Sequence, residues 1–248
     1  MKLLFSILSF IFLLYSCASR KEYIYLQGES ILNQKTINYS VKFKNDDLLS
    51  ITVLGADENN SNLFNLNISN NASNKNDGSK IGYLIDENGE IDFPIIGKVK
   101  IADLNRNEAI QLLKSKIGLY INNPIININI LNFKITVIGE VKNPGTFTIP
   151  NDRLTILEAI GLAGDLNITG KRKDIKVIRE EKGLTSEYLI DLTSKELLNS
   201  PVYYLKQNDV IYVSPNKTKV NSSAYNPSIT IFVSLATLLI TTINILSK

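Results

Sequence analysis

Apolar and polar residues alternate along short segments of the chain from Tyr39 to Pro215, and turn-forming residues separate these segments. A period of two residues predicts β-strands that are buried on one face. Two stretches break this period, because their apolar residues recur every three or four positions, as in a helix. Each follows a capping box, Asn105 with Glu108 and Thr155 with Glu158. Strands with packed helices predict an α+β fold.

Two turns between the predicted strands have recognisable residue pairs. Asn88-Gly89 lies between the alternating segments 81–85 and 91–93, which predicts a β-hairpin with a type I′ turn. Asn143-Pro144-Gly145 predicts a type II turn, in which Gly145 takes a positive φ. Residues 57–80 are rich in Asn and Ser and have few apolar side chains, which predicts a long surface loop.

One short pattern occurs twice. "KNDDLLSI" begins at Lys44 and "KQNDVIYV" begins at Lys206, so that Asp47 and Asp209 each precede a predicted strand. The favoured interpretation is a turn whose aspartate side chain bonds nearby backbone amides. A ligand-binding role for these carboxylates is the alternative.

The N-terminus is typical of an export signal. Lys2 precedes the apolar run Leu3–Tyr15, which is too short to span a bilayer comfortably. "LLYSCASR" follows and resembles a bacterial lipobox, which implies cleavage before Cys17 and lipidation of its sulfur. A buried or free cysteine is the alternative. A lipid on Cys17 would tether the mature chain outside the cytoplasm.

The C-terminal stretch 228–246 has no charged residue and would be about 28 Å long as a helix, close to a hydrocarbon core of about 30 Å. It predicts one transmembrane helix. Six polar residues recur along it with a period of 3.5, which places them on one stripe. The stripe fits either helix–helix packing or the wall of a water-filled lumen. Its members are Thr230, Ser234, Thr237, Thr241, Asn244 and Lys248.

The composition excludes several classes of function. The net charge of +3 is too small to indicate nucleic-acid binding. The chain has no histidine, and its single cysteine is Cys17, which excludes Ser-His and Cys-His nucleophiles and thiolate metal clusters. No Walker loop or dinucleotide-binding glycine motif is present. We therefore expect no enzymatic activity, no cofactor and no metal.

Two further motifs resemble a known family. "GEVKNPGTFTI" with "TILEAIGLAGDL" is similar to the soluble-ligand-binding β-grasp (SLBB) module of bacterial polysaccharide export lipoproteins, and "DENGEIDFPIIGKVK" is similar to the export domain that precedes it. The family usually has glycine at the positions of Asp46 and Asp165. The motif residues are Asn88, Gly89, Pro94, Gly97, Gly139, Glu140, Val141, Pro144, Gly145, Ala163 and Gly164.

The resemblance implies export of capsular or extracellular polysaccharide across the outer membrane of a Gram-negative bacterium, with most of the chain in the periplasm. It also implies a homo-oligomeric ring, a helical-barrel pore built from the C-terminal helices, and an inner-membrane co-polymerase or chain-length regulator as partner. With it, the lumen is the favoured use of the stripe. The alternative is a lipid-anchored polysaccharide-binding or scaffold protein whose terminal helix only anchors it. The predicted organisation is a signal peptide (1–16), a tether (17–37), an export domain (38–132), an SLBB domain (133–215), a linker (216–227) and a transmembrane helix (228–247).

Overall fold

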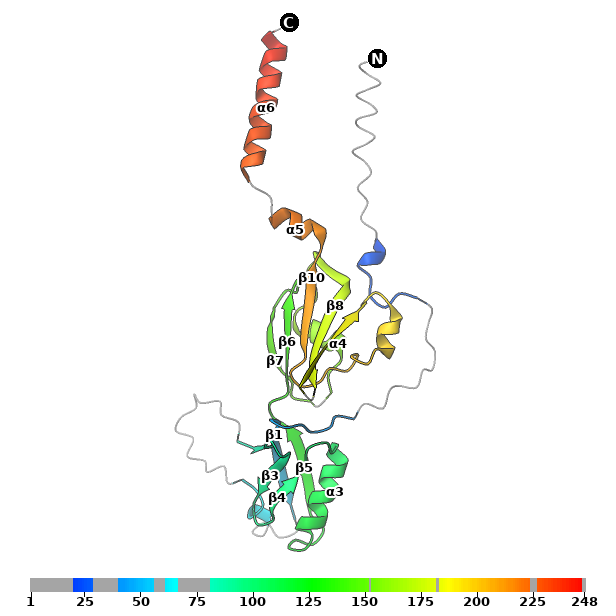
Figure 1. Cartoon of the computed structure of the whole chain (residues 1–248), viewed down its shortest axis with the longest axis vertical. Coiled ribbons are helices and arrows are strands. Elements are labelled where there is room, and N and C mark those ends of the chain that lie inside the picture. The colour runs from blue at the N-terminus through cyan, green and yellow to red at the C-terminus, as the bar shows by residue number, and fades with distance from the viewer. Residues whose placement is uncertain are drawn as a thin grey trace, which may run out of the picture.

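The computed structural model describes residues 20–28, 40–55, 61–66, 81–151, 153–181, 183–223 and 227–246. Two domains follow each other along the long axis of the molecule, and helices α5 (Lys217–Ser223) and α6 (Pro227–Leu246) extend beyond the second domain (Figure 1). The signal peptide, Cys17, most of the tether and most of the Asn/Ser-rich loop lie outside the described residues.

The first domain is built on a three-stranded antiparallel sheet in the order β2 (Tyr83–Leu84), β1 (Leu48–Leu54), β5 (Ile125–Ile130). A separate hairpin is formed by β3 (Glu90–Phe93) and β4 (Gly97–Lys100). Helix α3 (Arg106–Ile117) packs against β5 and begins at Asn105, where the predicted capping box is present. Its buried residues Ala109, Leu113 and Ile117 join the core of this domain.

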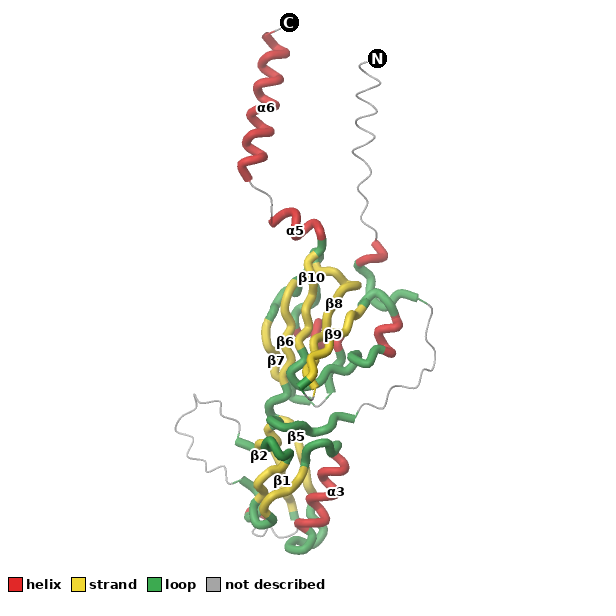
Figure 2. The backbone as a smooth tube through the Cα atoms, in the orientation of Figure 1, coloured by secondary structure: helices red, strands yellow, loops and turns green. Residues whose placement is uncertain are grey.

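The second domain is built on a five-stranded mixed sheet, and Figure 2 shows its strands side by side. β6 (Lys134–Gly139) and β10 (Val210–Pro215) are parallel neighbours, and the other pairs are antiparallel. Helix α4 (Ile156–Leu162) packs against β6 and begins at Thr155 with the second predicted capping box, and a short 3₁₀ helix, η2, spans Lys195–Asn199. The strand order is β7 (Gly145–Thr148), β6 (Lys134–Gly139), β10 (Val210–Pro215), β8 (Gly170–Glu181) and β9 (Leu184–Ile190).

The α+β prediction is confirmed, but both predicted turn types are wrong. At Asn88-Gly89 only Gly89 has a positive φ, +78°. The Asp86 carboxylate accepts hydrogen bonds from the backbone amides of Asn88 and Glu90, and this side chain produces a different turn from type I′. The strand before the turn also pairs with β1 rather than with β3. Gly145 has no positive φ, because it already belongs to extended β7.

Part of the predicted surface loop 57–80 is packed against the first domain. Phe64 is 2% exposed and belongs to the hydrophobic core. The Asn65 side chain accepts from the Val53 amide at 2.8 Å and donates to the Val53 carbonyl at 2.9 Å. These two bonds satisfy backbone groups of β1 that would otherwise be free to pair with another strand.

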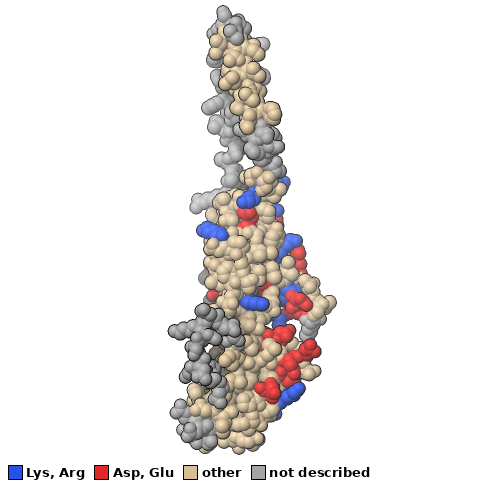
Figure 3. All heavy atoms as spheres, turned by 90° about the vertical axis from the view of Figure 1, so that its left-hand side faces the viewer, with Lys and Arg blue, Asp and Glu red and all other residues tan. Residues whose placement is uncertain are grey.

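The prediction of a C-terminal transmembrane helix is wrong. α6 is helical, but the described part of the chain contains no helix whose length and apolar character suffice to cross a membrane. The prediction used the absence of charge and the length of the segment, whereas a membrane span also needs a sustained apolar character. Figure 3 shows no Lys, Arg, Asp or Glu on α6, whereas both signs of charge are visible on the domains.

Hydroxyl groups on α6 bond to the helix's own backbone. Ser234 donates to the Ile231 carbonyl at 2.8 Å, Thr237 to the Val233 carbonyl at 2.7 Å, and Thr241 to the Thr237 carbonyl at 2.9 Å. Ser and Thr commonly bond in this way inside helices. The lumen interpretation of the stripe stays a prediction.

Candidate functional site at the domain joint

The repeated pattern forms two turns with the same backbone geometry. In the first, the Lys44 amide donates to Asp47 Oδ2 at 2.9 Å and the Asp47 amide donates to the Lys44 carbonyl at 3.2 Å. In the second, the Lys206 amide donates to Asp209 Oδ2 at 2.7 Å and the Asp209 amide to the Lys206 carbonyl at 3.1 Å. The interpretation of both aspartates as backbone-bonding turn residues is confirmed.

The residue before each aspartate is left-handed. Asp46 has a φ of +67° and Asn208 a φ of +66°. Asp and Asn tolerate this conformation better than most residues with a Cβ, and glycine adopts it without steric cost. The glycine that the family usually has at position 46 therefore fits the observed backbone.

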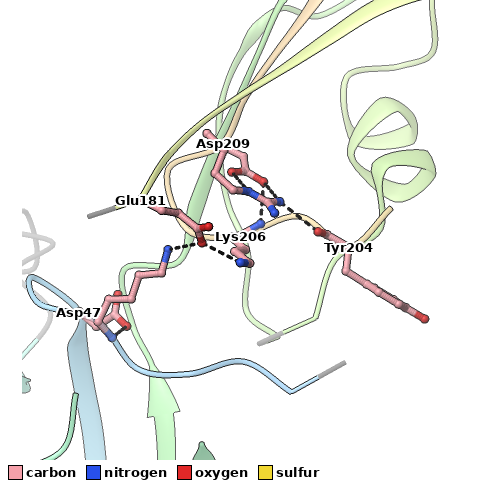
Figure 4. Close-up of polar contacts among 7 residues, drawn as sticks. Asp47, Glu181, Tyr204, Lys206 and Asp209 are labelled. Carbon is pink, nitrogen blue, oxygen red and sulfur yellow. Dashed lines mark hydrogen bonds and ion pairs between the residues drawn. The ribbon is translucent and has the colours of Figure 1, made fainter. Parts of the chain in front are cut away.

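Both lysines contact one carboxylate at the joint between the domains (Figure 4). Glu181, at the end of β8, accepts from Lys206 Nζ at 2.6 Å and from Lys44 Nζ at 3.4 Å through the same oxygen, Oε1. Lys206 and Glu181 belong to the second domain and Lys44 to the first. The pair of positive charges lowers the pKa of Glu181 against the opposing effect of its partial burial.

The second turn is further fixed by a buried arginine. Arg179 Nε donates to Asp209 Oδ1 at 2.8 Å, and Arg179 Nη2 donates to Asp209 Oδ2 at 2.6 Å. Nη2 also donates to the Tyr204 carbonyl at 3.1 Å (Figure 4). The Arg179 and Asp209 side chains are 4% and 1% exposed. A bidentate pair of this kind fixes both direction and distance.

The first turn has no equivalent arginine bond among its described contacts. Asp47 is 2% exposed, and its Oδ1 has no hydrogen-bond partner. Burial raises the pKa of Asp47 to about 6, although the Lys44 amide and ammonium oppose that rise. The two turns thus share a backbone form and differ in how their carboxylates are satisfied.

The short connection between the domains bonds to both turns. The Asn132 side chain accepts from the Leu48 amide at 2.9 Å and donates to the Asp46 carbonyl at 2.8 Å. Two residues later, the Lys134 amide donates to the Gln207 side chain of the second turn at 3.0 Å. The joint therefore combines two turns, one shared glutamate and the connecting segment 131–134.

Comparison with known proteins assigns both domains. A family model described as polysaccharide biosynthesis/export protein matches residues 35–131, and a model of the SLBB domain matches residues 133–213. The first domain is therefore a polysaccharide biosynthesis/export domain and the second is an SLBB domain. The boundary between the two matches falls at Asn132, whose side chain accepts a hydrogen bond from the Leu48 amide.

Two curated relatives support this assignment, and each is named EPS I polysaccharide export outer membrane protein EpsA. The relative from Ralstonia solanacearum is 28% identical over 156 residues, which cover 59% of this chain and 40% of the relative. The relative from Ralstonia nicotianae is 32% identical over 108 residues, which cover 42% of this chain and 28% of the relative. The chain spans less than half the length of the relatives it matches.

The family-motif residues of the first domain flank the β3–β4 hairpin rather than the joint. Asn88 and Gly89 precede β3, Pro94 follows β3, and Gly97 is the first residue of β4. Pro94 and Gly97 help to line a surface depression of about 440 Å³ with Leu66, Asp92, Phe93 and Ile95. Ile95 has a φ of +68°, which is unusual for a β-branched residue.

The family-motif residues of the second domain gather where β6 ends and α4 ends. Gly139 has a φ of +94°, and a Cβ there would lie 2.1 Å from the Val213 carbonyl oxygen. The Glu140 side chain accepts from the Thr169 hydroxyl at 2.6 Å, which is the first cause of its lowered pKa. Val141 and Ala163 are buried, Gly164 lies beside Lys142 and Asn143, and Pro144 precedes Gly145, the first residue of β7.

The neighbouring residues Gly164 and Asp165 are both left-handed, with φ values of +76° and +74°. The family's usual glycine at position 165 is explained by this backbone. The Asp165 carboxylate accepts from the Tyr25 hydroxyl, and the Gln27 amide donates to the Thr193 carbonyl at 2.6 Å. Residues 23–28 are thus attached to the second domain.

Neither Glu181 nor Arg179 was identified as a site residue from the sequence. The repeated lysine and aspartate supplied a signal for the turns, but nothing in the linear pattern indicated that both lysines contact one glutamate. That contact depends on how the two domains are placed in space.

Proposed function

We propose that this chain is a subunit of an outer-membrane machine that exports extracellular polysaccharide. The observation that carries the proposal is the order of its domains, with a polysaccharide export match followed directly by an SLBB match. An outer-membrane location is consistent with the names of both relatives. The family name describes export and not catalysis, in agreement with the absence of histidine and of a catalytic cysteine.

The finer proposal is a lipid-anchored subunit of a homo-oligomeric ring. The single cysteine directly after an N-terminal apolar run supports the anchor at Cys17. Exposed apolar side chains on α6, including Phe232 and Leu239, support contact with other copies, because large uncovered apolar surfaces mark interaction sites. The polymer and an inner-membrane co-polymerase are the proposed partners.

Deletion of the gene in the source bacterium, with complementation, tests the export role. We expect extracellular polysaccharide to fall at least tenfold in the deletion strain and to return with the wild-type gene. The matched control is complementation with Glu180→Gln, a substitution at an exposed strand position, which should restore export. Unchanged extracellular polymer in the deletion strain would contradict the proposal and favour a scaffold role.

Mass photometry of the full chain, purified in a mild detergent, tests the ring. We expect one dominant species whose mass is a whole multiple of the protomer mass. Heterologous contacts that close produce rings of fixed number, whereas contacts that do not close produce open filaments. A monomer across the accessible concentration range would contradict the oligomeric part of the proposal and leave the export role to the genetic test.

A further inference from the structure

The two lysine–aspartate turns are unequally supported. Both carboxylate oxygens of Asp209 accept hydrogen bonds from Arg179, inside a buried pair. Asp47 is equally buried, but only its Oδ2 has a hydrogen-bond partner. A buried polar oxygen without a partner disfavours the conformation that buries it. The first turn is therefore the weaker of the two.

Glu181 is likewise bound unequally to its two lysines. Its Oε1 is 2.6 Å from Lys206 Nζ and 3.4 Å from Lys44 Nζ. Glu181 ends β8 and Lys206 lies in the turn before β10, which pairs with β8, so their contact lies within the second domain. The Lys44 contact crosses the joint, and its two side chains are 38% and 40% exposed, so water and salt weaken it.

The segment that links the two domains lies beside these contacts. The pairs of helices and strands in extensive contact all lie within one domain or the other, as far as the structure describes the chain. Asn132 bonds to the first turn, whereas the Phe133 carbonyl accepts from Ile149 of the second domain at 2.8 Å. The backbone between Asn132 and Phe133 is thus the shortest segment between the two sets of bonds.

We propose that the joint is a one-sided latch. The ion pair between Glu181 and Lys206 stays formed, while the contact between Glu181 and Lys44 breaks. The first domain then rotates about the Asn132–Phe133 segment. Arg179 keeps the second turn closed in both states. The latch is a property of this chain's own contacts, and it does not depend on the identity of any exported polymer.

Hydrogen exchange on the full chain, read by mass spectrometry, tests the inequality of the turns. In the wild type we expect the amides of 44–48 to exchange at least several-fold faster than those of 206–209. Glu181→Gln should accelerate exchange at 44–48 by a further several-fold and leave 206–209 unchanged, because Arg179 still holds Asp209. Glu180→Gln is the matched control, since it removes the same charge one residue away, and it should change neither turn.

Lys44→Met and Lys206→Met provide a second pair of variants. Lys44→Met should reproduce the effect of Glu181→Gln at 44–48, whereas Lys206→Met should leave the first turn closed because Glu181 then binds Lys44 alone. Equal exchange at both turns in the wild type would overturn the proposal. An equal response of both turns to Glu181→Gln would also overturn it.

Interdomain distances test the rotation itself. Spin labels on a genetically encoded keto amino acid at positions 116 and 173 place one label on α3 and one on β8, both at exposed sites. We expect a distance distribution that broadens in Glu181→Gln and at high salt, but not in Glu180→Gln. Identical distributions in the wild type and Glu181→Gln would show that the glutamate does not restrain the domains and would overturn the latch.

Discussion

At the scale of single residues, Asp47 is the group that should respond most clearly to pH. Burial raises its pKa to about 6 in the folded chain from an ordinary value of 3.8. The folded state therefore holds the proton more tightly than the unfolded state between these values. This favourable contribution is complete below pH 3.8 and is lost as the pH rises through 6.

Asp47→Asn should remove that pH dependence. Relative to the wild type, its free energy of unfolding should increase by about 2 kcal/mol between pH 4 and pH 7, because an amide has no proton to lose. Urea unfolding across this range measures the difference. Asp46→Asn is the control, since Asp46 is exposed and asparagine tolerates its left-handed backbone. A constant difference between Asp47→Asn and the wild type would contradict the assigned burial.

The two turn aspartates should differ in what their removal costs. Asp209→Ala leaves the buried Arg179 guanidinium without its bidentate partner, which should reduce the free energy of unfolding by about 3–5 kcal/mol. Asp47→Ala removes one hydrogen bond and also relieves a buried charge, so its effect at neutral pH should be about 1 kcal/mol or less. Chemical unfolding of both variants provides the comparison, and equal losses would contradict the unequal support of the turns.

At the scale of elements, helix starts were more predictable than turns. The capping boxes at Asn105 and Thr155 are local in sequence, and both helices begin where these residues indicate. The turn at Asn88-Gly89 depends on the Asp86 side chain, which a rule about two central residues does not consider. The pairing of β2 with β1 depends on residues more than 30 positions apart and had no local signal.

Glycines at the ends of strands offer a test at this scale. Gly139→Ala would place a Cβ 2.1 Å from the Val213 carbonyl oxygen at a φ of +94°, so we expect a loss of more than about 2 kcal/mol in unfolding free energy. Gly145→Ala is the matched control. A Cβ there meets no atom within 4 Å, and the change should be within about 1 kcal/mol. Thermal unfolding of the two variants separates these cases, and similar melting temperatures would contradict the close approach of β6 and β10.

At the scale of the whole molecule, local patterns predicted the two turns of the joint but not the contact of both lysines with Glu181. The repeated turn at Lys44 and Lys206 was visible in the sequence, and so was its favoured interpretation. Glu181 had no signal in the sequence, because its distance from both lysines is set by the domain arrangement. The transmembrane prediction for 228–246 failed because no helix in the described part of the chain has the length and apolar character to cross a membrane.

The order of the two domains connects this molecule to export, and the joint shows how they are held. The export match and the SLBB match meet at Asn132, whose side chain bonds to the first domain. The central claim is that these domains act in the passage of polysaccharide through the cell envelope. That claim is distinct from the oligomeric state and from the latch.

The most direct measurement follows the location of newly made polymer while the protein is depleted. A strain with a repressible copy of the gene is pulse-labelled with a sugar precursor, and labelled polysaccharide is measured outside the cell and in the periplasm over time. We expect extracellular label to fall and periplasmic label to rise as the protein disappears, with recovery on re-expression. Continued appearance of extracellular polymer at the normal rate after complete depletion would contradict the account.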